Sequence, residues 1–174
     1  TVIESMSNKK KVKTTLHDIL RNIEHQSTLW RATPFTMIFL VRIFQKAVAE
    51  MDNNDIAYDI VKELLHFFKL IAELFQETEE YMEKMEMKKE KPLPYFSDML
   101  KEEYLFPEEC DNEEDEEMLW EEDVEKFNEQ SEYSFYYSIY YYSYQVLLNC
   151  NETLKKISNT AIAEQVNKLQ KLLY

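Results

Sequence analysis

The chain has 174 residues and none of them is glycine. Glycine is the residue that most readily adopts positive φ, which two-residue β-hairpins and many helix C-termini require. Neither Asn-Gly nor Asp-Gly can therefore mark a hairpin here, and the sequence argues against a β-rich fold. The absence also excludes a P-loop, a dinucleotide-binding fingerprint and a Gly-x-Ser-x-Gly nucleophile elbow, because each depends on glycine backbone.

The spacing of apolar residues predicts an all-α fold. We expect a polar N-terminal tail over residues 1–13, followed by a single helical domain over 14–174. The predicted helices cover about 15–31, 34–51, 55–89, 98–105 and 117–149, with a last one from about 160. This set of about six helices is typical of an irregular helical bundle or a short HEAT-like stack of helical hairpins. In it the first two helices form a hairpin, the second and third form the core, and the helix over 117–149 packs across them.

The predicted helix over 34–51 is apolar around most of its circumference. Its main stripe consists of Met37, Leu40, Val41, Phe44, Val48 and Met51. A second stripe covers much of the other side, with Phe35, Ile38, Phe39 and Ile43. A helix of this kind is normally central and has neighbours on several faces.

Tyrosine makes up seven of the twelve residues from Tyr133 to Tyr144. Tyrosine favours strands, but the residues recur at intervals of four and three, and no companion strand of similar quality exists. We therefore predict a helix. Seven phenols are too many to bury, and exposed tyrosines are enriched at protein interfaces. The expected tyrosine-faced binding surface consists of Tyr133, Tyr136, Tyr137 and Tyr141.

The net charge of −14 is concentrated in one segment. Residues 108–125 hold twelve Asp or Glu and no Lys or Arg, so the remainder has 22 acids against 20 bases. A nucleic-acid-binding protein shows a basic face, so we do not expect direct nucleic-acid binding. We expect a loop at about 107–117 that is either a solvated linker or a docking element for a basic partner protein. It lacks the ligand spacing of an EF-hand calcium loop. In a docking element, acids would steer association and apolar side chains would anchor it. The acids are Glu113, Glu114, Asp115 and Glu116, and the anchors are Trp120 and Phe127.

No group of residues has the spacing of a catalytic or metal site. Residues 63–66 form Glu-x-x-His, half of a di-metal motif, but a second copy is absent. The acidic neighbours of Cys110 disfavour a thiolate, and Cys150 has no visible base. Two free thiols fit a reducing compartment. The sequence thus predicts no catalytic residue, no metal ligand and no cofactor, and we expect the chain not to be an enzyme.

Function can be predicted only as a class. Since the chain begins at Thr1, we expect a domain cut from a longer protein. No apolar stretch approaches the ~20 residues of a membrane span. We expect a non-catalytic scaffold or adaptor domain that binds another protein within an intracellular assembly, nuclear or cytoplasmic. The alternative is a Bcl-2-like regulator that takes up an amphipathic partner helix in a groove, although the glycine-containing signature of that fold is missing. Both comparisons, HEAT-like and Bcl-2-like, are analogies of fold alone.

Overall fold

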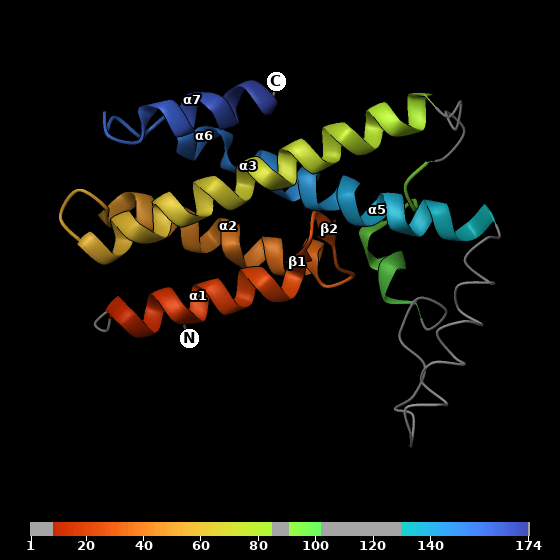
Figure 1. The fold of residues 1–174 in the computed structure, drawn as a ribbon, viewed down its shortest axis with the longest axis horizontal. Helices are drawn as coiled ribbons and strands as arrows, with labels where there is room; N and C mark the ends of the chain where they lie inside the picture. The colour runs from red at the N-terminus through yellow and green to blue at the C-terminus, as the bar shows by residue number, and fades with distance from the viewer. Residues whose placement is uncertain (1–8, 85–90, 102–129, 174) are drawn as a thin grey trace, which may run out of the picture.

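The computed structural model describes residues 9–84, 91–101 and 130–173. Within these ranges the fold is mainly helical, which confirms the all-α prediction (Figure 1). Five α-helices of ten residues or more occur there, against about six expected, and the HEAT-like stack is not confirmed. The elements are α1 (Lys9–Ile23), β1 (Glu24–His25), β2 (Thr28–Leu29), α2 (Thr33–Glu50), α3 (Asp55–Lys84), the 3-10 helix η1 (Phe96–Leu100), α5 (Gln130–Leu147), the 3-10 helix η3 (Leu148–Cys150), α6 (Asn151–Leu154) and α7 (Ala163–Leu172).

Helix α1 begins and ends earlier than the sequence predicted. The polar tail expected over 1–13 is wrong for residues 9–13, because Val12 is buried and opens the apolar stripe of the helix. The helix ends at Ile23, the last residue of its apolar stripe, rather than at residue 31. It packs chiefly on α3, so the expected hairpin of the first two helices is not formed.

A short β-hairpin takes the place of the predicted last turns of the first helix. Strands β1 and β2 pair in antiparallel register, Glu24 opposite Leu29. The two turn residues, Gln26 and Ser27, have φ of 52° and 64°. Positive φ at both central positions is the feature of a type I′ turn, which here forms without glycine or asparagine. This one hairpin is compatible with the expectation that the fold is not β-rich, because the described residues are otherwise mainly helical.

The turn into α2 closes the C-terminal end of α1. The Trp30 amide donates to the carbonyl of Ile23 at 3.2 Å, and the Thr33 hydroxyl donates to the same oxygen. Thr33 is the first residue of α2, one residue before the predicted start. Carbonyls at a helix end need such partners when they are buried.

The core lies where α2, α3 and α5 meet. Helices α2 and α3 pack together, and α5 packs across both, as predicted. Phe44 and Phe68 meet edge to face in the centre, with ring centroids 5.3 Å apart. The start of α3 at Asp55 was also predicted. The Asn54 side-chain oxygen accepts amide hydrogen bonds from Ile56 and Ala57, which caps the helix.

The last two turns of α3 project from the core. Most of their residues are exposed, and Lys84 pairs with Glu80 at 3.5 Å. Residues 85–89, predicted as helix, lie outside the described residues. The predicted short helix over 98–105 is a 3-10 helix over Phe96–Leu100, and residues 102–105 lie outside the described residues.

The tyrosine-rich stretch is helical, as predicted, over Gln130–Leu147. The expected earlier part, 117–129, lies outside the described residues. Near the predicted end at residue 149, α5 is followed by η3 and then by the short α6. Helix α7 then packs on α3. In the described part of the chain, none of the helices combines the length and apolar character needed to cross a membrane.

Candidate protein-binding surface

Helix α5 is held in the fold by its tyrosine hydroxyls. Burial of a phenol requires a partner for its hydroxyl, and α5 finds such partners in remote parts of the chain. The hydroxyls of Tyr142 and Tyr144 donate to the carbonyls of Leu93 at 2.6 Å and Leu172 at 3.0 Å. The Tyr137 hydroxyl donates to the Glu79 carboxylate at 2.5 Å, and the Tyr140 hydroxyl accepts from the Leu29 amide at 3.4 Å. Much of the tyrosine run is therefore structural.

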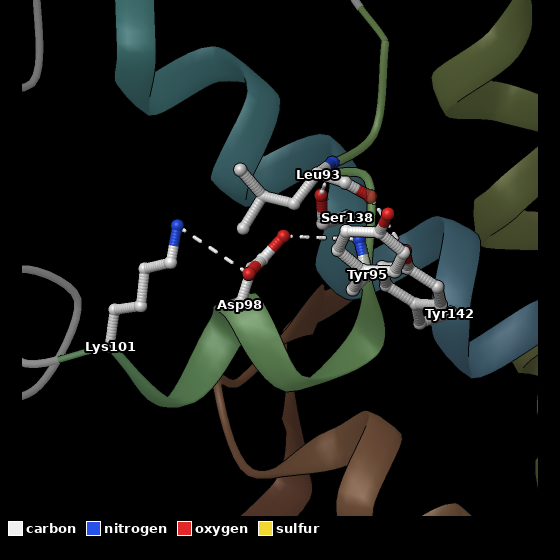
Figure 2. A network of polar contacts seen from close by, with 6 residues as sticks. All are labelled: Leu93, Tyr95, Asp98, Lys101, Ser138 and Tyr142. Atoms are coloured by element: carbon white, nitrogen blue, oxygen red, sulfur yellow. Dashed lines mark hydrogen bonds and ion pairs between the residues drawn. The ribbon is translucent and has the colours of Figure 1, made fainter.

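The segment 91–101 is fixed on α5 through Leu93, as Figure 2 shows. The Leu93 amide donates to the buried Ser138 hydroxyl at 2.7 Å, while its carbonyl accepts from Tyr142. Phe96 packs between Phe35 of α2 at 4.7 Å and Tyr142 at 5.3 Å, measured between ring centroids. Within the segment, the Asp98 carboxylate accepts a hydrogen bond from the Tyr95 amide at 3.1 Å and forms an ion pair with the Lys101 ammonium at 3.4 Å. This segment is thus joined to both α2 and α5.

The structure describes the side chains of three of the predicted tyrosines, Tyr136, Tyr137 and Tyr141. Tyr136 is exposed, but Tyr137 and Tyr141 are half-buried and pack against each other, with ring centroids 6.0 Å apart. Tyr141 also lies near Phe75 of α3, at 6.4 Å. The remaining predicted residues fall outside the described side chains; they are Glu113, Glu114, Asp115, Glu116, Trp120, Phe127 and the side chain of Tyr133. Their binding role stays a prediction.

A different set of exposed apolar side chains comes from the exit of the hairpin, the segment 91–101 and the first half of α5. These segments are neighbours in Figure 1, and the segment 91–101 is joined to α5 through Leu93 and Ser138. The Arg31 guanidinium lies over the Phe135 ring at 5.4 Å and links the hairpin exit to α5. We call this set the aromatic end; its members and exposed fractions are Trp30 (48%), Tyr95 (70%), Leu100 (57%) and Tyr136 (38%).

The acidic segment joins the fold at the aromatic end. Lys101 directly follows η1, and Gln130 begins α5, so the chain between them leaves and returns at this end. The described residues hold 17 Lys or Arg against 16 Asp or Glu. The described fold is therefore nearly neutral, and the twelve acids of 108–125 fall in the sequence between Lys101 and Gln130.

Groups that carry chemistry elsewhere are poorly placed for it here. Burial raises the pKa of the Cys150 thiol to about 12, which suppresses the thiolate. His66 is exposed, and no group of three or more His, Cys, Asp or Glu that could hold a metal occurs in the residues that the structure describes. A groove of about 150 Å³ lies between α1 and α3, and its lining mixes apolar side chains with Lys9, Lys13, Lys62, Asp59 and Glu63.

Comparison with known proteins finds no protein family, no curated protein and no solved structure that matches this chain. The surface is therefore described from its own geometry. Sequence reasoning missed Trp30, Tyr95 and Leu100, which lie in irregular or 3-10 segments. A signal was present, since each is a bulky apolar residue outside the regular apolar stripes.

Proposed function

We propose that this chain is a non-catalytic scaffold domain of an intracellular assembly, nuclear or cytoplasmic, and that it binds a basic partner protein at the aromatic end. The observation that supports the proposal is the position of the exposed aromatic side chains, at the end of the fold where the acidic segment is attached. The proposal does not depend on a HEAT-like stack of helical hairpins.

The two features have complementary roles in binding. Concentrated acids attract a basic surface over roughly one Debye length, about 8 Å at physiological salt, and raise the association rate. Aromatic side chains such as Trp30 and Tyr95 supply the buried contacts that hold a complex together. Neutralising the acids should therefore lower the association rate of the complex. Removing the aromatic residues should shorten its residence time.

The test uses the immobilised full chain and quantitative mass spectrometry of the proteins that it retains from a cell extract. One variant neutralises the acids (E113Q, E114Q, D115N and E116Q), and a second removes the anchors (W30A and Y95A). Tyr81→Ala is the matched control, because the exposure of Tyr81 (58%) lies between those of Trp30 and Tyr95 and Tyr81 is not a member of the aromatic end. We expect basic proteins to be retained several-fold less by both variants, and less by the wild type at 0.5 M than at about 0.15 M salt. Unchanged retention with unchanged salt dependence would contradict the proposal.

The Bcl-2-like alternative stays a second proposal, which no described contact favours. It needs an apolar groove for a partner helix. Titration of the full chain with amphipathic helical peptides tests it, and affinity no better than about millimolar removes it.

A further inference from the structure

The outward side of α2 carries an exposed aromatic residue and two bases on one stripe. Phe39 is 61% exposed, the second highest value among the large apolar residues described. Arg42 and Lys46 are also exposed, and neither has an ion pair with any described residue. Spacings of three and four residues place side chains on the same face of a helix. We call Phe39, Arg42 and Lys46 the α2 ridge.

The α2 ridge is exposed, and its stripe is covered only one turn earlier, where Phe35 packs on Phe96 of η1. The opposite side is buried against α3 and α5, through residues such as Met37 and Phe44. The ridge is flanked by Ile38 and Ile43, which are only half-buried. A helix that is apolar on this much of its surface normally has neighbours on several faces. The ridge therefore has the composition of a docking surface.

Charge determines what kind of partner fits the ridge. The chain contains no Asp or Glu from His25 to Ala49, and Glu50 follows only at the last residue of α2. Arg42 lies one turn from Phe39 and Lys46 two turns from it, so both cations lie on the same stripe of α2 as the aromatic residue. An Arg guanidinium binds a carboxylate through two parallel hydrogen bonds, and a Lys acts as a point charge.

We infer that the α2 ridge binds an amphipathic helix of a partner protein that carries carboxylates beside bulky apolar residues. Phe39 packs between the apolar residues of the partner helix, as in ordinary helix-on-helix packing. Arg42 and Lys46 pair with its acids and set its register. This surface has the opposite charge preference to the aromatic end and shares no residue with it. Each proposal can therefore fail without the other.

The test measures fluorescence anisotropy of two labelled helical peptides with the full chain. Both peptides are about 18 residues long, five turns, and share one Leu and Trp stripe. Glu flanks the stripe in one peptide and Lys in the other. We expect the Glu peptide to bind at least about tenfold more tightly than the Lys peptide. Phe39→Ala should weaken its binding about tenfold, whereas Tyr81→Ala should not, although Tyr81 is 58% exposed.

Charge reversal provides the second arm of the test. R42E with K46E should reverse the preference, so that the Lys peptide binds more tightly. The control, K10E with K13E, changes the net charge equally on the exposed side of α1 and should leave both affinities within about twofold. These residues are exposed, and circular dichroism should show an unchanged fold. Equal binding of the two peptides, or equal effects of the Phe39 and Tyr81 variants, would overturn the inference.

The chain's own acids are the competing occupant. In the variant that neutralises residues 113–116, the affinity for the Glu peptide should stay unchanged. A rise of more than about threefold would assign the ridge to the chain's own acidic segment and contradict a partner helix.

Discussion

Replacing Ser27 by glycine should stabilise the protein. Ser27 has φ of 64°, and a left-handed conformation costs an L-residue roughly 1–2 kcal/mol. Glycine removes that cost but loses about 0.5–1 kcal/mol more conformational entropy on folding. The Ser27 amide, which donates to the Glu24 carboxylate at 2.8 Å, is kept in the variant. The free energy of unfolding should therefore rise by about 0.5–1 kcal/mol, which corresponds to a Tm increase of roughly 1–4 °C.

The assay is urea unfolding followed by circular dichroism, with Lys62→Gly as the control. Lys62 is exposed within α3, where φ is helical, so glycine there should lower the free energy of unfolding by about 0.5–1 kcal/mol. Replacement by glycine should thus raise the free energy of unfolding at position 27 and lower it at position 62. If Ser27→Gly destabilises the protein as much as Lys62→Gly does, the description of a strained turn is refuted.

Three further predictions concern side chains of α5 and η3. Tyr142→Phe removes the donor to the Leu93 carbonyl and should cost about 1 kcal/mol in urea unfolding, whereas Tyr141→Phe should cost much less; equal losses would contradict the network in Figure 2. Cys150 should resist alkylation in the native protein up to strongly alkaline pH and react once urea unfolds it, because burial raises its pKa to about 12; rapid native alkylation in a Cys110→Ser background would disprove this. Burial and the Glu79 carboxylate raise the pKa of Tyr137, so its contribution to stability is full below about pH 10 and falls above it; a pH slope unaltered by Tyr137→Phe would count against it.

The sequence predicted those parts of the fold that local chemistry determines. Pro34 favours the first turn of a helix, and the Asn54 side chain caps the start of α3. Both helices begin close to where they were expected. The stripe from Ala57 to Ile71 is buried along α3 because its spacing is helical throughout. The helix within the tyrosine run was predicted on the same grounds.

The features that the sequence did not predict depend on contacts distant in sequence. The hairpin is supported by burial of Leu29 and by Tyr140, a residue 111 positions away from it. Tyr137 and Tyr141 pack inward because α3 lies beside them, which periodicity cannot show. The α2 ridge was missed because the second apolar stripe of α2 predicted a covering neighbour. Periodicity alone cannot show that Phe39 on this stripe is left exposed.

The most direct test of the protein-binding role is the effect of the aromatic end on partner retention. Retained proteins should be compared between the wild-type chain, the W30A and Y95A double variant, and the matched Tyr81→Ala variant, all at physiological salt. We predict that the double variant loses most of the basic proteins that the wild type and Tyr81→Ala retain. Equal retention by all three would contradict the aromatic end as the binding surface.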